Sequence, residues 1–303
     1  MNKETNPLLC DPETGVCEMP QRPEKDTLAA AVSQVKPVKL SYFTDPICSS
    51  CWGIEVQLRK LKLEYGNYFE IDYHMGGLLP DWSYNSGGIS KPSDVAHHWD
   101  EVSAYYDMPI DGDVWLEDPL HSSYPPSIAF KAAQLQSEDK ALDFMRIIRE
   151  MVFLQKKNIT KWEHLADAAA QVGLDSTQLK SDYEGRAKAL FEADLNLSRN
   201  SGVRGFPSIF FSDTSGNKEL VYGARPYATF EAALLKAYPQ AKKQTYANDW
   251  ESLFNAFASL TAREFSELSG QPRKQAEAFL TKLTTEGKLE VLKTKNGSLW
   301  KKR

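Results

Sequence analysis

The chain has 303 residues, of which 42% are hydrophobic and 25% are charged, a composition typical of a soluble globular protein rather than a fibre or a disordered chain. Its 36 Lys and Arg residues against 41 Asp and Glu residues give a formal charge of −5, which argues against wholesale binding to nucleic acid or anionic lipid. The N-terminus lacks the apolar core of a secretion signal, and no later segment approaches the roughly 18 apolar residues that span a bilayer. We therefore expect a cytoplasmic protein with no membrane partner.

Residues 1–35 mix Pro, Glu, Lys, Asn and Thr without periodicity, which predicts a flexible leader. The leader contains Cys10 and Cys17, which are candidates for an auxiliary dithiol that relays electrons to a second cysteine pair. Two alternatives stay open at this point. The thiols could simply be exposed in a mobile tail, or they could capture a metal with ligands from elsewhere in the chain.

A β-α-β unit follows the leader. The run Val38–Thr44 alternates apolar and polar side chains and predicts a strand. The next stretch, CWGIEVQLRKLKLEYG, has the apolar spacing of an amphipathic helix that closes at Gly66, and YFEIDYHMGG predicts a second strand. The two strands must be parallel, because the connection between them contains a helix.

The motif DPICSSCWG, residues 45–53, places two cysteines where this strand gives way to the helix. A helix N-terminus can favour a thiolate, so we expect Cys48 to be the attacking thiol and its pKa to be lowered. Cys51 lies one helical turn further and would resolve a mixed disulfide at Cys48. Half of a zinc site would look the same, but it needs two further ligands, and the β-α-β frame favours redox chemistry.

Four residues near the motif are candidates for supporting roles. Asp45 and Glu55 lie close enough in sequence to assist proton transfer at Cys51, although Asp45 could equally cap the helix or shape the turn. Trp52 is expected to pack beside the site and, with Phe206, to contact the substrate.

Residues from about 80 to 201 change to a helical character and predict an inserted all-helical subdomain. Within it, Thr160 and Glu163 match a capping box at the start of one helix. His97 and His98 are adjacent on a predicted helix, so they face different ways and cannot act as one pair of metal ligands. We expect no bound metal and no cofactor.

After the insertion, GVRGFPSIFF predicts a strand that Pro207 opens directly after Phe206, and we expect a cis peptide bond between these two residues. A second strand and a helix complete an α/β core. We place this core at residues 36–240.

Residues 246–303 predict a small C-terminal domain of two helices joined at Gly270 and a hairpin that turns at Asn296-Gly297, which resembles a winged helix. Its Lys and Arg residues could meet phosphates, but a single copy on an acidic chain makes nucleic acid an unlikely partner. A docking or packing role is the better interpretation.

The residues 45–52, the helical insertion and the stretch Gly202–Pro207 together resemble the DsbA family of thioredoxin-fold oxidoreductases, from about Lys36 to Tyr238. Within that family the chain is most similar to the cytoplasmic FrnE-like and Spx-adaptor (SpxH, also called YjbH) branches. The stretches at 111–136 and 155–160, and a C-terminal extension that ends near GSLWKK, resemble the Spx-adaptor branch in particular. The resemblance implies a thioredoxin fold with a helical insertion and catalytic roles for Cys48, Cys51 and Pro207. Spx adaptors deliver a transcription regulator to the ClpXP protease, and there the cysteines can be dispensable.

Two hypotheses follow from the sequence. The first is a cytoplasmic thiol-disulfide oxidoreductase or isomerase that acts on protein substrates with disulfides or thiols. The alternative is an adaptor that uses the same scaffold to present a client regulator to a protease, without redox catalysis.

Overall fold

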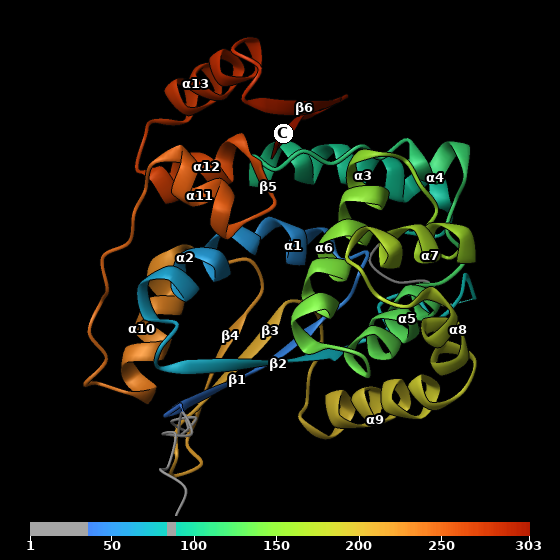
Figure 1. Ribbon diagram of the computed structural model, residues 1–303. Helices are drawn as coiled ribbons and strands as arrows, with labels where there is room; N and C mark the ends of the chain where they lie inside the picture. Colours follow the sequence, from blue (N-terminus) through green and yellow to red (C-terminus); the bar gives the residue numbers. More distant parts are fainter. Residues whose placement is uncertain (1–35, 84–88) are drawn as a thin grey trace, which may run out of the picture. The chain divides into compact units, whose positions relative to one another are not determined.

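The computed structural model describes residues 36–83 and 89–303, so Cys10, Cys17 and the expected leader lie outside the described residues (Figure 1). In chain order the elements are β1 (Val38–Thr44), α1 (Ser49–Gly53), α2 (Glu55–Tyr65), β2 (Phe69–Met75), α3 (Pro92–Tyr106), α4 (Val114–Glu117), α5 (Tyr124–Gln134), α6 (Glu138–Leu154), α7 (Trp162–Gln171), α8 (Ser176–Glu184), α9 (Arg186–Asn200), β3 (Ser208–Ser212), β4 (Lys218–Tyr222), α10 (Tyr227–Ala237), α11 (Trp250–Ala256), β5 (Ser259–Thr261), α12 (Ala262–Ser269), α13 (Arg273–Thr285), β6 (Leu289–Thr294) and β7 (Gly297–Lys302). No helix in the described part of the chain has the length and apolarity to cross a bilayer.

A four-stranded mixed sheet in the order β2-β1-β3-β4 forms the centre of the α/β core. β1 runs parallel to β2 and antiparallel to β3, so the predicted β-α-β unit is confirmed. Alternate apolar side chains of the strands, such as Leu40 and Ile209, share one buried cluster with Leu61 of α2 and Phe230 of α10. Helices α2 and α10 therefore cover this face of the sheet.

Helices α3 to α9 lie between β2 and β3 in sequence, although β3 pairs with β1 in the sheet. They form a group beside the sheet, drawn in green to yellow in Figure 1. Their own core is centred on buried aromatic side chains such as Phe130, Phe144 and Phe153. The predicted α/β class with a helical insertion is confirmed.

We call residues 246–303 the C-terminal module. It contains the predicted pair of helices, α12 and α13, and the predicted β6-β7 hairpin, together with α11 and a three-stranded sheet in the order β5-β7-β6. Phe265, Leu280 and Trp300 belong to its core, and Val56 of α2 packs into the same cluster. The winged-helix name for this module stays a prediction.

Two local predictions were wrong. The single helix expected after the cysteine motif is broken at Ile54 into α1 and α2. The capping box at Thr160 and Glu163 is absent, because α7 begins at Trp162, and Asn158 Oδ1 instead accepts hydrogen bonds from the N–H and hydroxyl of Thr160 at 3.0 and 2.6 Å.

Candidate active site and charge network

The two cysteines lie where β1 gives way to α1. Cys48 is the N-cap residue of α1, and its Sγ accepts a hydrogen bond of 3.1 Å from the backbone N–H of Cys51. Both are free thiols. One helical turn separates the two side chains, so they can share a proton or form an intramolecular disulfide.

Pro207 lies beside the cysteine motif. The Phe206–Pro207 peptide bond is cis, as predicted. In the antiparallel register of β1 and β3, Phe43 lies opposite Ser208. Pro207, the residue before Ser208, therefore lies opposite Thr44, at the end of β1 and just before the motif. Sequence reasoning therefore brought together two segments that the fold does place side by side.

Cys48 and Phe206 line the same cavity, which has a volume of about 790 Å³. This is within the range of ordinary small-ligand pockets, about 300–1,000 Å³. The Phe206 ring lies directly over Gly76, where any Cβ would collide with it. Four large aromatic side chains form much of the remaining wall: Trp82, Trp99, Trp115 and Tyr124.

Burial changes the expected chemistry of the first thiol. Only 4% of Cys48 is exposed, and this burial, reinforced by the hydrogen bond with Cys51, raises the pKa of the Cys48 thiol well above its ordinary value. The prediction that the helix N-terminus lowers this pKa was therefore wrong. A single backbone N–H, at the start of a helix of five residues, does not offset the loss of hydration.

Cys51 shifts in the other direction. Its side chain is fully buried, which opposes the thiolate, but the hydrogen bond with Cys48 and the nearby charge of Arg149 outweigh this and lower the pKa of Cys51. In the reduced dithiol the negative charge is thus favoured on the inner sulfur, away from solvent.

Asp45 lies in the turn before Cys48 and is fully buried. Its carboxylate accepts hydrogen bonds from the N–H groups of Ile47 at 3.0 Å and Leu78 at 2.7 Å and from the hydroxyl of Ser123 at 2.8 Å. Burial nevertheless raises the pKa of Asp45 to about 6. The turn-shaping role is seen directly, and the raised pKa keeps the proton-transfer role available as a prediction.

Glu55 does not fit the proton-transfer role that the sequence predicted. Its side chain is 14% exposed and lies between Arg146 and Arg149, with oxygen–nitrogen distances of 2.9 and 2.7 Å. Burial opposes its ionisation, but the arginine charges outweigh it and lower the pKa of Glu55 to about 2. A carboxylate that stays ionised at neutral pH is a structural partner of these arginines and not a proton donor.

Trp52 does not line the cavity either. Its side chain is fully buried, its Nε1–H donates to the carbonyl of Pro109 at 3.1 Å, and its ring stacks on Phe153. The expectation that Trp52 contacts a substrate is therefore corrected, because no external group reaches this ring. Phe206 keeps its place at the cavity wall.

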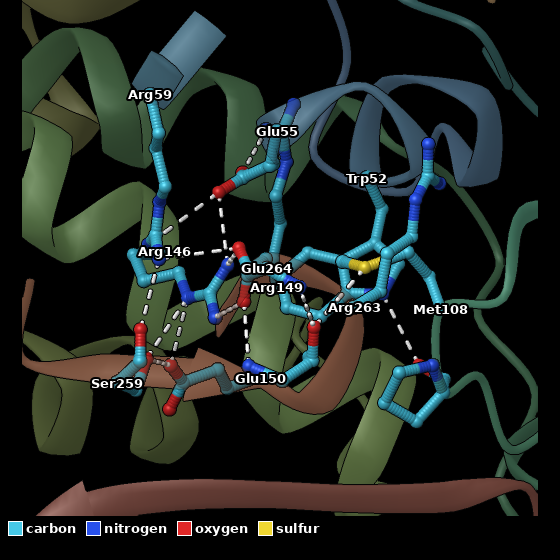
Figure 2. A network of polar contacts seen from close by, with 12 residues as sticks. Trp52, Glu55, Arg59, Met108, Arg146, Arg149, Glu150, Ser259, Arg263 and Glu264 are labelled. Atoms are coloured by element: carbon cyan, nitrogen blue, oxygen red, sulfur yellow. Dashed lines mark hydrogen bonds and ion pairs between the residues drawn. The ribbon is translucent and has the colours of Figure 1, made fainter. Parts of the chain in front are cut away.

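A largely buried network of charged side chains connects α2, α6 and α12 (Figure 2). Arg149 of α6 donates to Thr44 Oγ1 at 2.7 Å and to the carbonyl of Asp45 at 3.2 Å, and so holds the end of β1. Its other Nη donates to Glu55 at 2.7 Å. Glu55 also accepts a hydrogen bond of 2.9 Å from Arg146, which lies on α6 one turn before Arg149.

Arg146 is the centre of the network. Two of its nitrogens bind the carboxylate of Glu264 in α12 at 3.0 and 3.1 Å, while its Nε donates to Glu150 and to Ser259 Oγ at 2.9 and 3.1 Å. The guanidinium also lies over the Trp52 ring, 4.4 Å from its centre. Side chains of the core, the insertion and the C-terminal module thus meet at one arginine.

Two more cations complete the network. Arg59 of α2 pairs with Glu264 at 3.1 Å, and Lys301 of β7 pairs with Glu150 at 2.7 Å. We define the charge network by its seven ionised side chains, four cationic and three anionic: Arg59, Arg146, Arg149, Lys301, Glu55, Glu150 and Glu264.

Sequence reasoning missed this network, although α6 carries a signal for it. Arg146, Arg149 and Glu150 stand at spacings of three and four within the second half of α6, residues 144–154, whose other side chains are apolar, so they share one buried side. Buried charges are normally paired, which predicts partners from other elements but does not identify them.

The basic side chains of the C-terminal module are largely engaged within the chain. Lys295 binds Asp100 and Asp113 at 2.5 and 2.9 Å, and Arg273 binds Asp107 at 2.7 Å. The tip of the hairpin thus rests on the helical insertion. Among residues 36–83 and 89–303, no group of three or more His, Cys, Asp and Glu side chains is arranged to hold a metal ion.

Comparisons with known proteins extend over the whole chain. A family model described as thioredoxin matches residues 42–232. The chain is 33% identical to the ClpXP adapter protein SpxH of Halalkalibacterium halodurans, over 99% of both chains. It is 28% identical to the protein of the same name from Bacillus subtilis, over 88% of this chain and 89% of the relative.

A solved structure with a similar fold is the cytosolic disulfide reductase DsbM from Pseudomonas aeruginosa. The TM-score is 0.54 at 21% identity, and the match covers 66% of this chain and all of the other. At this level of identity the likeness concerns the fold alone.

Proposed function

Because this chain belongs to the thioredoxin family, and within it to the group of SpxH proteins, we propose that it is an adaptor that delivers a client transcription regulator to the ClpXP protease. The proposed mechanism is binding: the chain holds client and protease together and needs no redox turnover of its own.

The observation that carries this proposal is the extent of the similarity to SpxH. The thioredoxin model ends at residue 232, whereas the match to the relative from Halalkalibacterium halodurans covers 99% of the chain and therefore includes the C-terminal module. A thiol oxidoreductase does not require this module. An adaptor has a use for it, because two partners need two surfaces held in a fixed relation.

The contacts of the module support such a fixed relation. The hairpin tip donates from Asn296 Nδ2 to Asp100 at 2.7 Å and to the carbonyl of Ile110 at 2.8 Å, and Arg263 donates to the carbonyls of Gly53 and Tyr106. These contacts add to the charge network, so the module is docked at several points on the core and the insertion.

Degradation of the client regulator by purified ClpXP, with and without this chain, tests the proposal. We expect the chain to accelerate loss of the client, and no acceleration would reject the adaptor function. Asn296→Ala should reduce the acceleration because it loosens the hairpin tip. Asn217→Ala is the matched control, because Asn217 bonds only within its own exposed turn, to Asp213.

Thiol-disulfide exchange is the second candidate function, and one observation favours it. Cys48 and Phe206, next to the cis-proline Pro207, line one cavity that a protein or peptide thiol could enter. The raised pKa and burial of Cys48 argue for slow attack on an external disulfide. Reduction of a model disulfide protein by the chain, lost in Cys48→Ser, would support this function, and absence of exchange with glutathione would reject it.

The substrates of the exchange reaction and the cellular location stay predictions. The substrates of an exchange reaction would be proteins with disulfides or thiols. A cytoplasmic location also stays a prediction.

A further inference from the structure

Two lines of contacts connect the cysteine motif with the C-terminal module. The first runs through the charge network. Arg149 holds Thr44 and the carbonyl of Asp45, Glu55 joins Arg149 to Arg146, and Arg146 binds Glu264 of α12. Each of these links is 3.2 Å or shorter. The side chains of Glu55, Arg146 and Arg149 are each at most 14% exposed.

The second line runs through the loop between α3 and α4. Trp52, which follows Cys51, donates to the carbonyl of Pro109 at 3.1 Å. The hairpin tip touches the same loop from the other side: Asn296 donates to the carbonyl of Ile110, and Gly297 fits against Pro109 so closely that a Cβ would lie 3.0 Å from its side chain. The loop is therefore in contact with the cysteine motif on one side and with the hairpin tip on the other.

The charges of the network determine in which direction the module shifts the equilibrium between the dithiol and the disulfide. Arg149, the cation whose charge lowers the pKa of Cys51, also lies beside Asp45, and it has a buried Nε for which the described residues provide no hydrogen-bond partner. A thiolate at Cys51 supplies a negative charge beside Arg149. A disulfide carries none, so oxidation leaves a more positive network in a medium where charge is costly.

We propose that the charges of the C-terminal module set how readily Cys48 and Cys51 form a disulfide, and that the disulfide in turn strengthens the docking of α12 through Glu264. The reaction is an exchange with a low-molecular-weight disulfide. The bond between Cys48 Sγ and Cys51 Sγ forms as the S–S bond of the oxidant breaks, and two electrons pass to the oxidant. The proton of Cys48 leaves with one released thiol, and the other half of the oxidant leaves as a thiolate that takes its proton from solvent. Coupling of two equilibria is reciprocal, so each effect implies the other.

This inference goes beyond the adaptor function and does not depend on it. It makes the dithiol a sensor whose state changes the presentation of the C-terminal module, whether or not the cysteines take part in delivery of the client.

The test measures the equilibrium constant between the dithiol and glutathione disulfide. It uses the full chain with Cys10→Ser and Cys17→Ser, so that only Cys48 and Cys51 report. Glu264→Gln removes an anion from the module while the amide can still cap α12, and it should favour the reduced form by about fivefold or more. Lys301→Met removes a cation from the same network and should shift the equilibrium in the opposite direction.

Lys274→Met is the matched control, because Lys274 belongs to the C-terminal module but to none of the contacts of the network, and its shift should stay below about twofold. Shifts below about twofold for both network variants, or shifts of reversed sign, would overturn the proposal. If Glu264→Gln fails to fold by circular dichroism, the sign of the Lys301→Met shift decides.

Hydrogen exchange of the parent protein tests the reciprocal effect. The amides of α12 should exchange more slowly in the oxidised than in the reduced protein, while the amides of β1 and β3 serve as the internal control. Equal exchange of α12 in both states would overturn the coupling. Neither measurement involves the protease or the client, so a failure of the adaptor function leaves both results interpretable.

Discussion

Arg146 and Glu264 form a two-point salt bridge inside the protein, with nitrogen–oxygen distances of 3.0 and 3.1 Å and a fully buried carboxylate. The same carboxylate accepts the backbone N–H of Thr261 at 2.7 Å and completes the capping box of α12. One side chain therefore both starts a helix of the C-terminal module and fixes that module to the helical insertion. The residue that caps α12 is therefore also the residue that binds the module to Arg146 of the insertion.

Arg146→Met should destabilise the protein by about 3–5 kcal/mol, because it leaves buried carboxylates without their central partner. The measurement is the free energy of unfolding in urea. Arg199→Met is the control, since the exposed pair of Arg199 and Glu192 should contribute less than about 1 kcal/mol. Equal effects of the two substitutions would contradict the structural role assigned to the network.

Asp45 should make stability fall as the pH rises. Burial raises its pKa from 3.8 to about 6, so the folded state holds the proton more tightly than the unfolded state. This contribution is fully present below about pH 4 and is lost as the pH rises through about 6, a change of about 3 kcal/mol. The measurement is the difference in unfolding free energy between the parent and Asp45→Asn across this range. A difference that does not vary with pH would refute the assignment.

Cys48 should react slowly with iodoacetamide at neutral pH, because burial raises the pKa of its thiol and limits access. We expect a rate at least about tenfold below that of glutathione, followed by mass spectrometry in a chain with Cys10→Ser and Cys17→Ser. Cys51→Ser removes the neighbouring thiol and its hydrogen bonding to Cys48, and should speed the reaction of Cys48. Rapid alkylation of the parent would support the exchange function instead.

Gly76 lies in the wall of the cavity, and Gly112, which lies outside it, provides a comparison. In Gly112→Ala the new Cβ meets the backbone carbonyl of Ala96, which cannot move aside, and a loss of about 2 kcal/mol or more is expected. In Gly76→Ala the Cβ meets only the end of the half-buried Phe206 ring, which can swing away. We expect this substitution to cost less than about 1 kcal/mol and to weaken any ligand that enters the cavity beside Cys48. Thermal and urea unfolding distinguish the two.

Most strands, helices and turns of the fold could be predicted from the sequence, because the patterns that indicate them involve only neighbouring residues. The alternation in Val38–Thr44, the apolar spacing of the helices and the turn at Asn296-Gly297 each report on a few neighbouring residues. The pairing of Cys48 with Pro207 came from a family resemblance and not from the residues alone. The break at Ile54 has no comparable signal, and we have no physical account of it from the sequence.

The chemistry of the site was harder to predict, because it depends on burial and on partners distant in sequence. The helix N-terminus suggested a reactive Cys48, but the amount of solvent that reaches the sulfur is set by the insertion and the cavity wall. Glu55 was identified as a proton carrier by its closeness to Cys51, whereas Arg146 and Arg149 of α6 decide its pKa. The capping box at Thr261 and Glu264 was readable from its spacing, but the bond from Glu264 to Arg146 was not.

The central claim is that this chain acts by presenting a client and not by exchanging disulfides. The most direct test is ClpXP degradation of the client regulator with the double variant Cys48→Ser and Cys51→Ser. We predict that the variant accelerates loss of the client as much as the parent does, with both reactions faster than the one without the chain. Acceleration by the parent that disappears in the variant would contradict the claim and place the chemistry of the dithiol at the centre of the function.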